Sequence, residues 1–276
     1  MHSIQSRLPC VELRSYVRAY AQREITGSLI DVVQSMPASL EGIIELDFAN
    51  PPIVEYLNGA VKKATRTSIV GPGTYRSHSI RLPSPVDSFG IFFQPMGLRQ
   101  LFGIPGPMLV NEEHSAIDVL GNGILHLWER MGQNKCFAAR VRIVDEYLLQ
   151  AAAQATVCTV VMACAGRIFR ERGVMRVDSS ASDAALSVRQ YERRFLEEIG
   201  IPPKLFARIT RCQMAMDAKL TRPNSSWLTI AHEFGYHDQM HMIKDFQKLN
   251  NDSPAGVLAQ LGDMRPEALA AIASIL

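Results

Sequence analysis

The residues whose spacing comes closest to a catalytic motif are His232 and Glu233, followed by His237. In zinc proteases, two histidines four residues apart share one helix face, and a glutamate between them acts as the general base. Here the second histidine comes five residues after the first, and Gly235 interrupts the helix between them. The two imidazoles therefore cannot share one helix face, and we expect no metalloprotease chemistry.

The histidines of the N-terminal half also lack the spacing of a metal site. His78 lies in a strand-like segment and His114 follows Glu112 and Glu113, but no H-x-H pattern with a downstream glutamate occurs. Metal-binding barrels need such convergent nitrogen and oxygen ligands. We therefore expect no metal, no cofactor and no catalytic residue, and a protein that is not an enzyme.

Other charged residues belong to a pattern that occurs twice, with the copies 51 positions apart. Each copy holds a helix N-cap, two core positions four apart, a left-handed turn residue, a proline that starts a helix and an apolar contact. The first copy is Ser187, Tyr191, Phe195, Gly200, Pro203 and Phe206, and the second is Asp238, Met242, Phe246, Asn251, Pro254 and Val257. The pattern indicates one helical module used twice.

The first module presents a charged outer face. Ser187 and Gln190 form a capping box at the start of its helix, and apolar positions three and four apart face inward. The outer face holds Arg189, Glu192 and Arg193. Arg193 also has Glu197 four residues later, and this pair alone would be compatible with an ordinary solvated surface.

The second module presents a more apolar outer face. A short scaffold helix in WLTIAHEF is followed by a turn at Gly235, and Asp238 then caps a helix whose Met242 and Phe246 point inward. The outer face holds Met240, Ile243 and Lys244. Both modules therefore offer the N-terminal half of a helix to a groove in a partner.

The N-terminal part predicts a strand-rich domain. The segment VELRSYVRAYA predicts a helix, and short β-rich runs follow, separated by glycine and proline. These runs are DVVQSM, GIIELDF, PIVEYL, TSIVG and SFGIFFQP. The arrangement is typical of a small antiparallel barrel or sandwich. Phe89, Phe92 and Phe93 are expected in its core or in the wall of a pocket.

The segment from about 115 to 173 predicts helices. LGNGILHLWERM, FAARVRIVDEYLLQ and TVVMACAGRIFRERG carry apolar residues at three- and four-residue spacing. We expect these helices to connect the two halves of the chain. Their apolar faces, including Trp128, could pack within the chain or form a homodimer.

Composition favours two domains in a cytoplasmic protein. The 276 residues exceed a typical single domain, and 47% are hydrophobic, which suffices for real cores. The first 30 residues are too charged for a signal peptide, and the apolar run at 151–165 is too short to span a bilayer. The five cysteines form no C-x-x-C pair, which favours reduced thiols. Residues 166–260 hold 14 Lys and Arg against 11 Asp and Glu, a net charge of +3.

The segment from about 166 to 262 resembles the DNA-binding domain of AraC/XylS-type bacterial transcriptional regulators. The matching stretches are SVRQYERRFLEEIGIPP, FARITRCQMAMDAKL and IAHEFGYHDQMHMIKDFQKLNNDSPAGV. The N-terminal half resembles more weakly, through FFQPMGLRQLFGIPG, the β-rich sensor domains that precede such units. The resemblance implies two helix-turn-helix units joined by a long central helix.

The resemblance also implies that the two recognition helices enter successive major grooves on one face of DNA, about one turn (~34 Å) apart. The residues that would then face DNA are Arg189, Gln190, Glu192, Arg193, Gln239, Met240, Ile243 and Lys244. Arginine can bond a guanine edge, glutamate can accept from cytosine, glutamine can read adenine, and an apolar side chain can meet a thymine methyl group.

The expected fold class is α+β. We expect a β-rich, barrel-like and cupin-like sensor or dimerisation domain at 1–115 and a helical linker at 116–165. An all-α domain with two helix-turn-helix units would occupy 166–262, followed by a helical tail at 263–276. The expected function is that of a sequence-specific DNA-binding regulator, an activator or a repressor, controlled by a small molecule or partner at the N-terminal domain.

The expected partner is double-stranded DNA, with RNA polymerase, a small-molecule effector and a second copy of the chain as further candidates, and no membrane. Two alternatives stay open for the N-terminal domain. It could be an enzyme module that modifies a small molecule, which a metal or a pocket with convergent histidine and carboxylate groups would favour. It could instead bind only another protein, which a filled barrel would favour.

Overall fold

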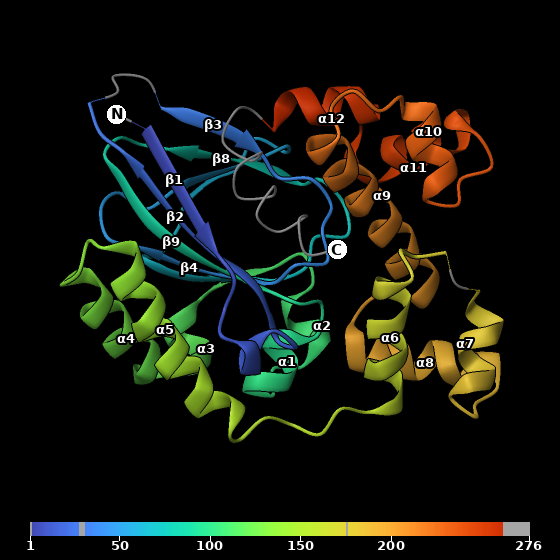
Figure 1. The fold of residues 1–276 in the computed structure, drawn as a ribbon, viewed down its shortest axis with the longest axis horizontal. Helices are drawn as coiled ribbons and strands as arrows, with labels where there is room; N and C mark the ends of the chain where they lie inside the picture. The colour runs from blue at the N-terminus through green and yellow to red at the C-terminus, as the bar shows by residue number, and fades with distance from the viewer. Residues whose placement is uncertain (1, 28–30, 175, 262–276) are drawn as a thin grey trace.

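The computed structural model describes residues 2–27, 31–174 and 176–261. A β-rich part and an all-helical part lie side by side (Figure 1). The helical tail expected at 263–276, and residue 262 at the end of the expected DNA-binding domain, lie outside the described residues. The described residues confirm the α+β class.

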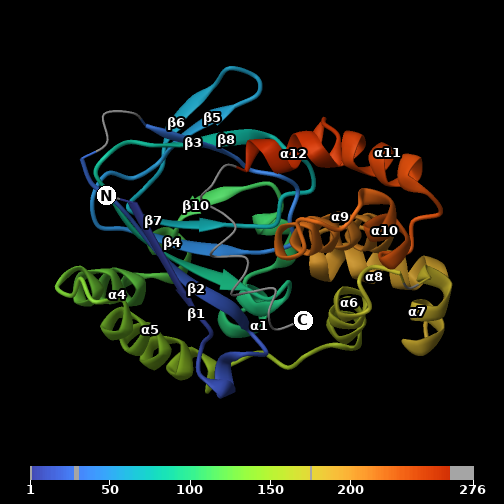
Figure 2. The ribbon, with the colours of Figure 1, turned by 45° about the horizontal axis from the view of Figure 1, so that its top comes forward.

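The described strands form two antiparallel sheets, one of six strands and one of four. The larger sheet has the order β1, β2, β9, β4, β7, β10, and the smaller has the order β3, β8, β5, β6. The larger sheet contains β1 (His2–Arg7), β2 (Val17–Ile25), β4 (Ile43–Asp47), β7 (Thr67–Val70), β9 (Val86–Phe93) and β10 (Glu113–Ser115). The smaller sheet contains β3 (Val32–Ser35), β5 (Ile53–Tyr56), β6 (Val61–Lys63) and β8 (His78–Leu82). Figure 2 shows the smaller sheet facing the larger one.

The prediction of a helix in VELRSYVRAYA is wrong. Only a 3-10 turn, η1 (Val11–Leu13), forms there, and the chain then enters β2 between β1 and β9. Val17, Ala19 and Tyr20 are at most 1% exposed. A strand that is buried on both faces loses the alternation of apolar and polar residues that distinguishes a strand from a helix.

The larger sheet separates a packed core from an inner space. Along β4, Ile44 and Leu46 are fully buried under helices, whereas Ile43, Glu45 and Asp47 face the smaller sheet and line a cavity there. The covering helices are α3 (Ala116–Leu120), α4 (Asn122–Gly132) and α5 (Phe137–Ala152) (Figure 1). Successive side chains of a strand point to opposite faces of the sheet, so alternate residues of β4 meet the core and the cavity.

The segment 116–165, expected as a linker, divides between the two cores. Helices α3 to α5 complete the core of the β domain, whereas α6 (Val160–Arg170) packs in the core of the helical domain. Residues 153–159 form the connection, so Cys158 is exposed and the apolar run at 151–165 is not one helix. Trp128 stacks on Phe48, with ring centroids 6.2 Å apart, so its face packs within the chain.

No helix in the described part of the chain is both long and apolar enough to cross a lipid bilayer.

The repeated module is confirmed by the helical domain. Its remaining helices are α7 (Val177–Asp183), α8 (Val188–Ile199), α9 (Pro203–Thr221), α10 (Trp227–Glu233), α11 (Gln239–Asn250) and α12 (Pro254–Gln260). Ser187 and Asp238 cap α8 and α11, and Gly200 and Asn251 end these helices with left-handed φ values of 84° and 56°. The inward anchors are fully buried: Tyr191, Phe195, Met242 and Phe246. Two helix-turn-helix units, α7 with α8 and α10 with α11, are thus joined by α9.

The β domain also contacts the helical domain directly, through two short helices that follow β9. These are α1 (Gly97–Phe102) and α2 (Gly106–Leu109). Gly106 lies against the end of α8, where a Cβ atom would come within 2.5 Å of the main-chain carbonyl group of Ile199. No side chain fits in this contact between two backbones.

Replacing Gly106 with alanine should therefore lower the free energy of unfolding by about 1–3 kcal/mol, because backbone atoms must move apart. Gly166→Ala in α6 is the matched control, since nothing lies within 4 Å of its added Cβ atom. This control should be neutral or more stable by up to about 1 kcal/mol, since glycine weakens a helix interior. Thermal unfolding of both variants tests the contact, and equal Tm values would contradict it.

Candidate functional site

Helix α8 presents the first set of predicted contact residues to solvent. Ser187 Oγ accepts a hydrogen bond from the Gln190 main-chain nitrogen at 3.3 Å, and Gln190 Oε1 accepts one from the Ser187 nitrogen at 3.1 Å. This capping box fixes the start of the helix. Arg189, Gln190, Glu192 and Arg193 are all exposed. The side-chain oxygen of Gln190 is engaged in the cap, which leaves its amide NH2 group for a partner.

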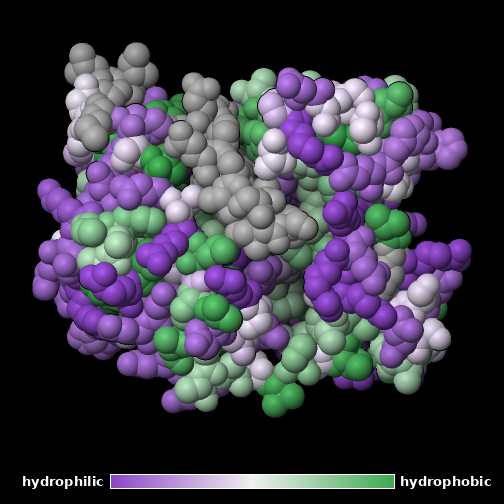
Figure 3. All heavy atoms as spheres, viewed as in Figure 1, coloured by the Kyte–Doolittle hydropathy of each residue, from purple (hydrophilic) through white to green (hydrophobic). Residues whose placement is uncertain are grey.

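Helix α11 presents the second set. Asp238 accepts a hydrogen bond from the main-chain nitrogen of His241 at 2.7 Å, and this bond, together with that from the His237 side chain, lowers the pKa of Asp238. His241 packs edge-on against Tyr236, with ring centroids 5.4 Å apart. Gln239, Met240 and Lys244 are exposed and Ile243 is half-buried. Figure 3 shows hydrophilic side chains gathered over the helical domain at the right of the molecule.

The central helix holds α11 through charge pairs. Asp245 of α11 lies 3.0 Å from Arg208 Nε and 3.7 Å from Arg211, both on α9. The Arg211 guanidinium also lies over the ring of Tyr236, at 5.0 Å from its centroid. Asp245 is only 6% exposed, so these contacts are shielded from solvent. They fix the direction in which α11 presents its outer face.

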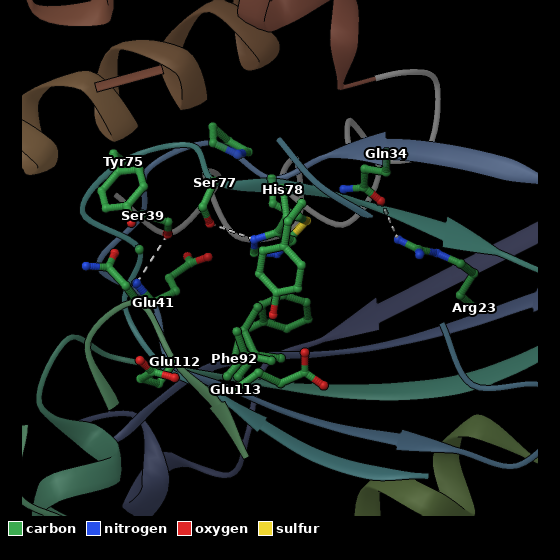
Figure 4. A pocket seen from close by; sticks show the side chains of 18 residues that line it. Arg23, Gln34, Ser39, Glu41, Tyr75, Ser77, His78, Phe92, Glu112 and Glu113 are labelled. Atoms are coloured by element: carbon green, nitrogen blue, oxygen red, sulfur yellow. Dashed lines mark hydrogen bonds between the residues drawn. The ribbon is translucent and has the colours of Figure 1, made fainter. Parts of the chain in front are cut away.

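A pocket lies between the two sheets. Among the described residues it consists of two adjoining cavities of about 120 and 130 Å³, which share part of their walls. Figure 4 shows Glu41, Ser39 and Tyr75 at one end, His78 in the middle, and Arg23 and Gln34 at the other end, with Phe92 and Glu113 below. Phe92 thus lines the pocket, while Phe89 and Phe93 are buried in the core beneath the larger sheet.

The pocket is polar at its wall on the larger sheet. Glu45, Asp47, Ser68 and Ser88 project from β4, β7 and β9, and Glu113 joins them from β10. Ser68 Oγ donates a hydrogen bond to Glu113 Oε1 at 3.1 Å. The opposite wall, on the smaller sheet, is mostly apolar.

Comparison with known proteins agrees with this architecture. Residues 180–260 match the protein-family model described as a helix-turn-helix domain. Two crystal structures of ToxT from Vibrio cholerae each have a TM-score of 0.50 with this chain, at 10% and 11% sequence identity. The matched regions cover 95% and 94% of this chain, and 99% of each ToxT chain. An apo ToxT variant from the same species has a TM-score of 0.52 at 9% identity, with 94% of this chain and 97% of that chain covered. No curated protein sequence matches the chain.

The helix-turn-helix match is of the AraC type, and it falls on both units and the central helix that joins them. Residues 180–260 form a DNA-binding domain of the AraC type. At 9–11% identity, the likeness to ToxT concerns the fold. That fold includes the β domain as well as the helical one, since it extends over nearly the whole chain.

The chain carries a DNA-binding domain of the kind found in transcription factors. Its pocket does bring His78 and Glu113 into one cavity, which is the convergence expected of an enzyme module. In the described part of the chain, however, no group of three or more histidine, cysteine or acidic side chains could hold a metal ion. The barrel is also not filled, since the cavities remain between its sheets.

Two carboxyl groups in the pocket of the regulator have strongly shifted pKa values. Burial, followed by the nearby Glu45 carboxylate, raises the pKa of Asp47 to about 9. Burial also raises the pKa of Glu45, although Arg23 and Ser88 favour its charged form. Burial lowers the pKa of His78, so its imidazole is neutral at pH 7. The raised pKa keeps the Asp47 carboxyl group protonated at neutral pH.

The proton on Asp47 predicts a pH dependence of stability. Its folded pKa of about 9 lies above the value of about 3.9 in an unfolded chain. The folded state thus retains a proton that the unfolded chain releases, so the free energy of unfolding should fall as pH rises from about 4 towards 9. Urea unfolding at several pH values should show this slope in the wild type and a smaller slope in Asp47→Asn. Equal slopes would contradict the assignment.

The rim of the pocket is attached to the DNA-binding domain. Arg18 of β2 pairs with Glu41 at the rim and, at 2.9 Å, with Asp217 of α9. The Leu40 main-chain nitrogen donates to Gln213 of α9 at 3.1 Å. Further bonds join Ala38 to Asn250 and Arg76 to Leu249, both on α11. The segments that close one end of the pocket thus touch both the central helix and the second recognition helix.

The sequence analysis expected Phe92 in the core or in a pocket wall, but it did not reveal that Glu45 and Asp47 line the pocket. The only available signal was the alternation in β4, where Glu45 and Asp47 follow Ile43 at two-residue spacing. An alternation of this kind normally marks a strand with one face in solvent.

Proposed function

We propose that this regulator reads its operator through the outer faces of α8 and α11. The proposed contact residues are Arg189, Gln190, Glu192, Arg193, Gln239, Met240, Ile243 and Lys244. The observation that supports this choice is their placement, because seven of the eight are exposed on the N-terminal halves of two capped helices. We further propose that the protein acts in the cytoplasm, where its DNA is found.

The two faces suit different contacts. Arg189 and Arg193 can each bond a guanine edge or a phosphate, and Glu192 can accept a hydrogen bond from cytosine. On α11, Gln239 can read adenine and Met240 can meet a thymine methyl group. The first helix should therefore contribute more of the salt-dependent part of the affinity, since arginine contacts to phosphate release counterions.

The test compares Arg193→Ala and Lys244→Ala with the wild type. Genomic fragments selected by the wild-type protein serve as DNA, and fluorescence anisotropy at physiological salt gives the affinity. Each substitution should weaken binding by about five- to 100-fold, which corresponds to about 1–3 kcal/mol for a lost base contact. Arg142→Ala, an exposed arginine on α5, is the control and should bind like the wild type. If both helix variants also bind like the wild type, the proposed reading faces are wrong.

We also propose that a small molecule in the pocket controls DNA binding. This proposal is supported by the ion pairs at the rim of the pocket, where Arg18 joins Glu41 to Asp217 of the central helix. A ligand that prefers one arrangement of the rim would shift the population of the DNA-binding domain between orientations. Contact with RNA polymerase and formation of a homodimer remain predictions.

A further inference from the structure

The geometry points to an organic amine as the occupant of the pocket: its protonated nitrogen would sit against Glu45 and Asp47, and its apolar body would lie between the sheets. This inference rests on the proposal that the pocket is the effector site. It adds the chemical class of the effector.

The charge of the cavity favours a cation. Glu45, Asp47 and Glu113 face the same cavity, and among its described lining residues Arg23 is the one arginine, with no lysine. Arg23 also donates a hydrogen bond to Gln34 at 3.3 Å. Arg66, which is exposed, also acts on Asp47. Three carboxyl groups and one guanidinium therefore line the cavity, and Arg23 acts on both Glu45 and Asp47.

Asp47 shows that the acidic wall is incomplete without a partner. The residue is 2% exposed, and its Oδ2 atom has no hydrogen-bond partner among the described residues. Leaving a buried carboxyl oxygen unpaired costs free energy that a ligand donor would recover. The neighbouring Glu45 lies over Gly90, where an added Cβ atom would come within 2.9 Å of Glu45 Oε2. Gly90 thus leaves space for this carboxylate in the cavity wall.

The rest of the cavity fits an apolar body. Its lining includes the apolar side chains Ile4, Val54, Ile80, Leu82 and Phe92. The cavity of about 130 Å³ is close to the size of an apolar cavity that holds a benzene ring, about 150 Å³. An organic cation would satisfy the acidic wall and the apolar lining together. A primary amine on an aryl or alkyl chain satisfies both walls.

Binding of an amine should move a proton. In the empty pocket the Asp47 carboxyl group is protonated at pH 7, and a bound ammonium group favours its ionised form. The ammonium ion enters with its own proton, Asp47 loses one, and solvent receives it. Calorimetry in buffers of different ionisation enthalpy measures this release directly.

The test uses three probes that share a phenylethyl body: 2-phenylethylamine, 2-phenylethanol and 3-phenylpropionate. We expect the amine to bind the full-length protein at least tenfold more tightly than either other probe and to release up to one proton at pH 7. Asp47→Asn should weaken amine binding at least tenfold, abolish the proton release and leave the affinity for the alcohol unchanged. Glu129→Gln, which alters an exposed acid on α4, is the charge control and should change none of these values.

Urea unfolding of Asp47→Asn at pH 7 checks that the variant folds, since asparagine has nearly the same shape as the residue that it replaces. Tighter binding of the alcohol or the carboxylate, binding of none of the three probes, or amine binding that Asp47→Asn does not alter, would each overturn the amine assignment.

A separate measurement distinguishes this failure from failure of the proposed function. Saturating amine should change the DNA affinity of the wild type but not that of Ala21→Leu, whose larger side chain enters the cavity from β2. Amine binding with proton release but without any effect on DNA affinity would support the ligand class and overturn the effector role.

Discussion

Replacing Arg18 with methionine is expected to lower the free energy of unfolding by about 3–5 kcal/mol, because it leaves two buried carboxylates without their shared cation. Arg18, Glu41 and Asp217 are 7%, 5% and 4% exposed. In the variant, both carboxyl groups must either stay charged in a dry interface or take up protons. Urea unfolding at about pH 7 measures the loss.

The stability of this variant at about pH 7 is compared with that of a matched control. Arg14→Met is the matched control, since Arg14 is exposed and lies shortly before Arg18 in the sequence, and it should change stability by less than about 0.5 kcal/mol. A loss in Arg18→Met no larger than in this control would show that the ion pairs do not stabilise the interface.

Arg140→Met is expected to destabilise the β domain by about 3 kcal/mol, because Arg140 is fully buried and joins several elements. Its guanidinium binds both carboxylate oxygens of Asp87 on β9, at 2.6 and 3.0 Å. The Arg140 Nε atom donates a hydrogen bond to the carbonyl oxygen of Asn134 at 2.6 Å, and the Arg140 Cζ atom lies 4.0 Å from the Phe48 ring centroid. Methionine fills similar space but leaves these acceptors unpaired.

The control for this prediction is Arg130→Met. Arg130 also pairs with an acid, Glu146 at 2.8 Å, but both side chains are more than half exposed. An exposed pair contributes about 0–1 kcal/mol, so this variant should unfold near the wild-type midpoint in urea. If Arg140→Met costs no more than Arg130→Met, the buried arginine does not hold β9 and α5 together.

The helical domain could be predicted from the sequence because its determinants are local. Caps at Ser187 and Asp238, and turn residues at Gly200 and Asn251, act within four residues of the helix ends that they define. Because the same local signals occur twice, each copy supports the other. The charged outer faces followed from the helix period, without any knowledge of tertiary contacts.

The β domain was predictable in class but not in its important details. The five β-rich runs became strands, but β2 was read as a helix because it is buried on both faces. The pairing of Arg18 with Glu41 and Asp217 joins positions 23 and 199 residues apart, and no local pattern indicates such contacts. Glu45 and Asp47 alternate with apolar residues along β4, and only closure by the smaller sheet places them inside a cavity.

The attachment of the pocket rim to α9 and α11 limits how the two domains of this protein can be exchanged with those of other regulators. The connection at 153–159 is the obvious place to join the sensor domain to the DNA-binding domain of another regulator. Such a chimera would keep both folds, but it would lose the amide of Gln213, the carboxylate of Asp217 and the amide of Asn250 that receive the rim. An exchange of domains at the connecting peptide is therefore not enough to transfer effector control to a new operator. The residues of α9 and α11 that contact the pocket rim must be transferred as well.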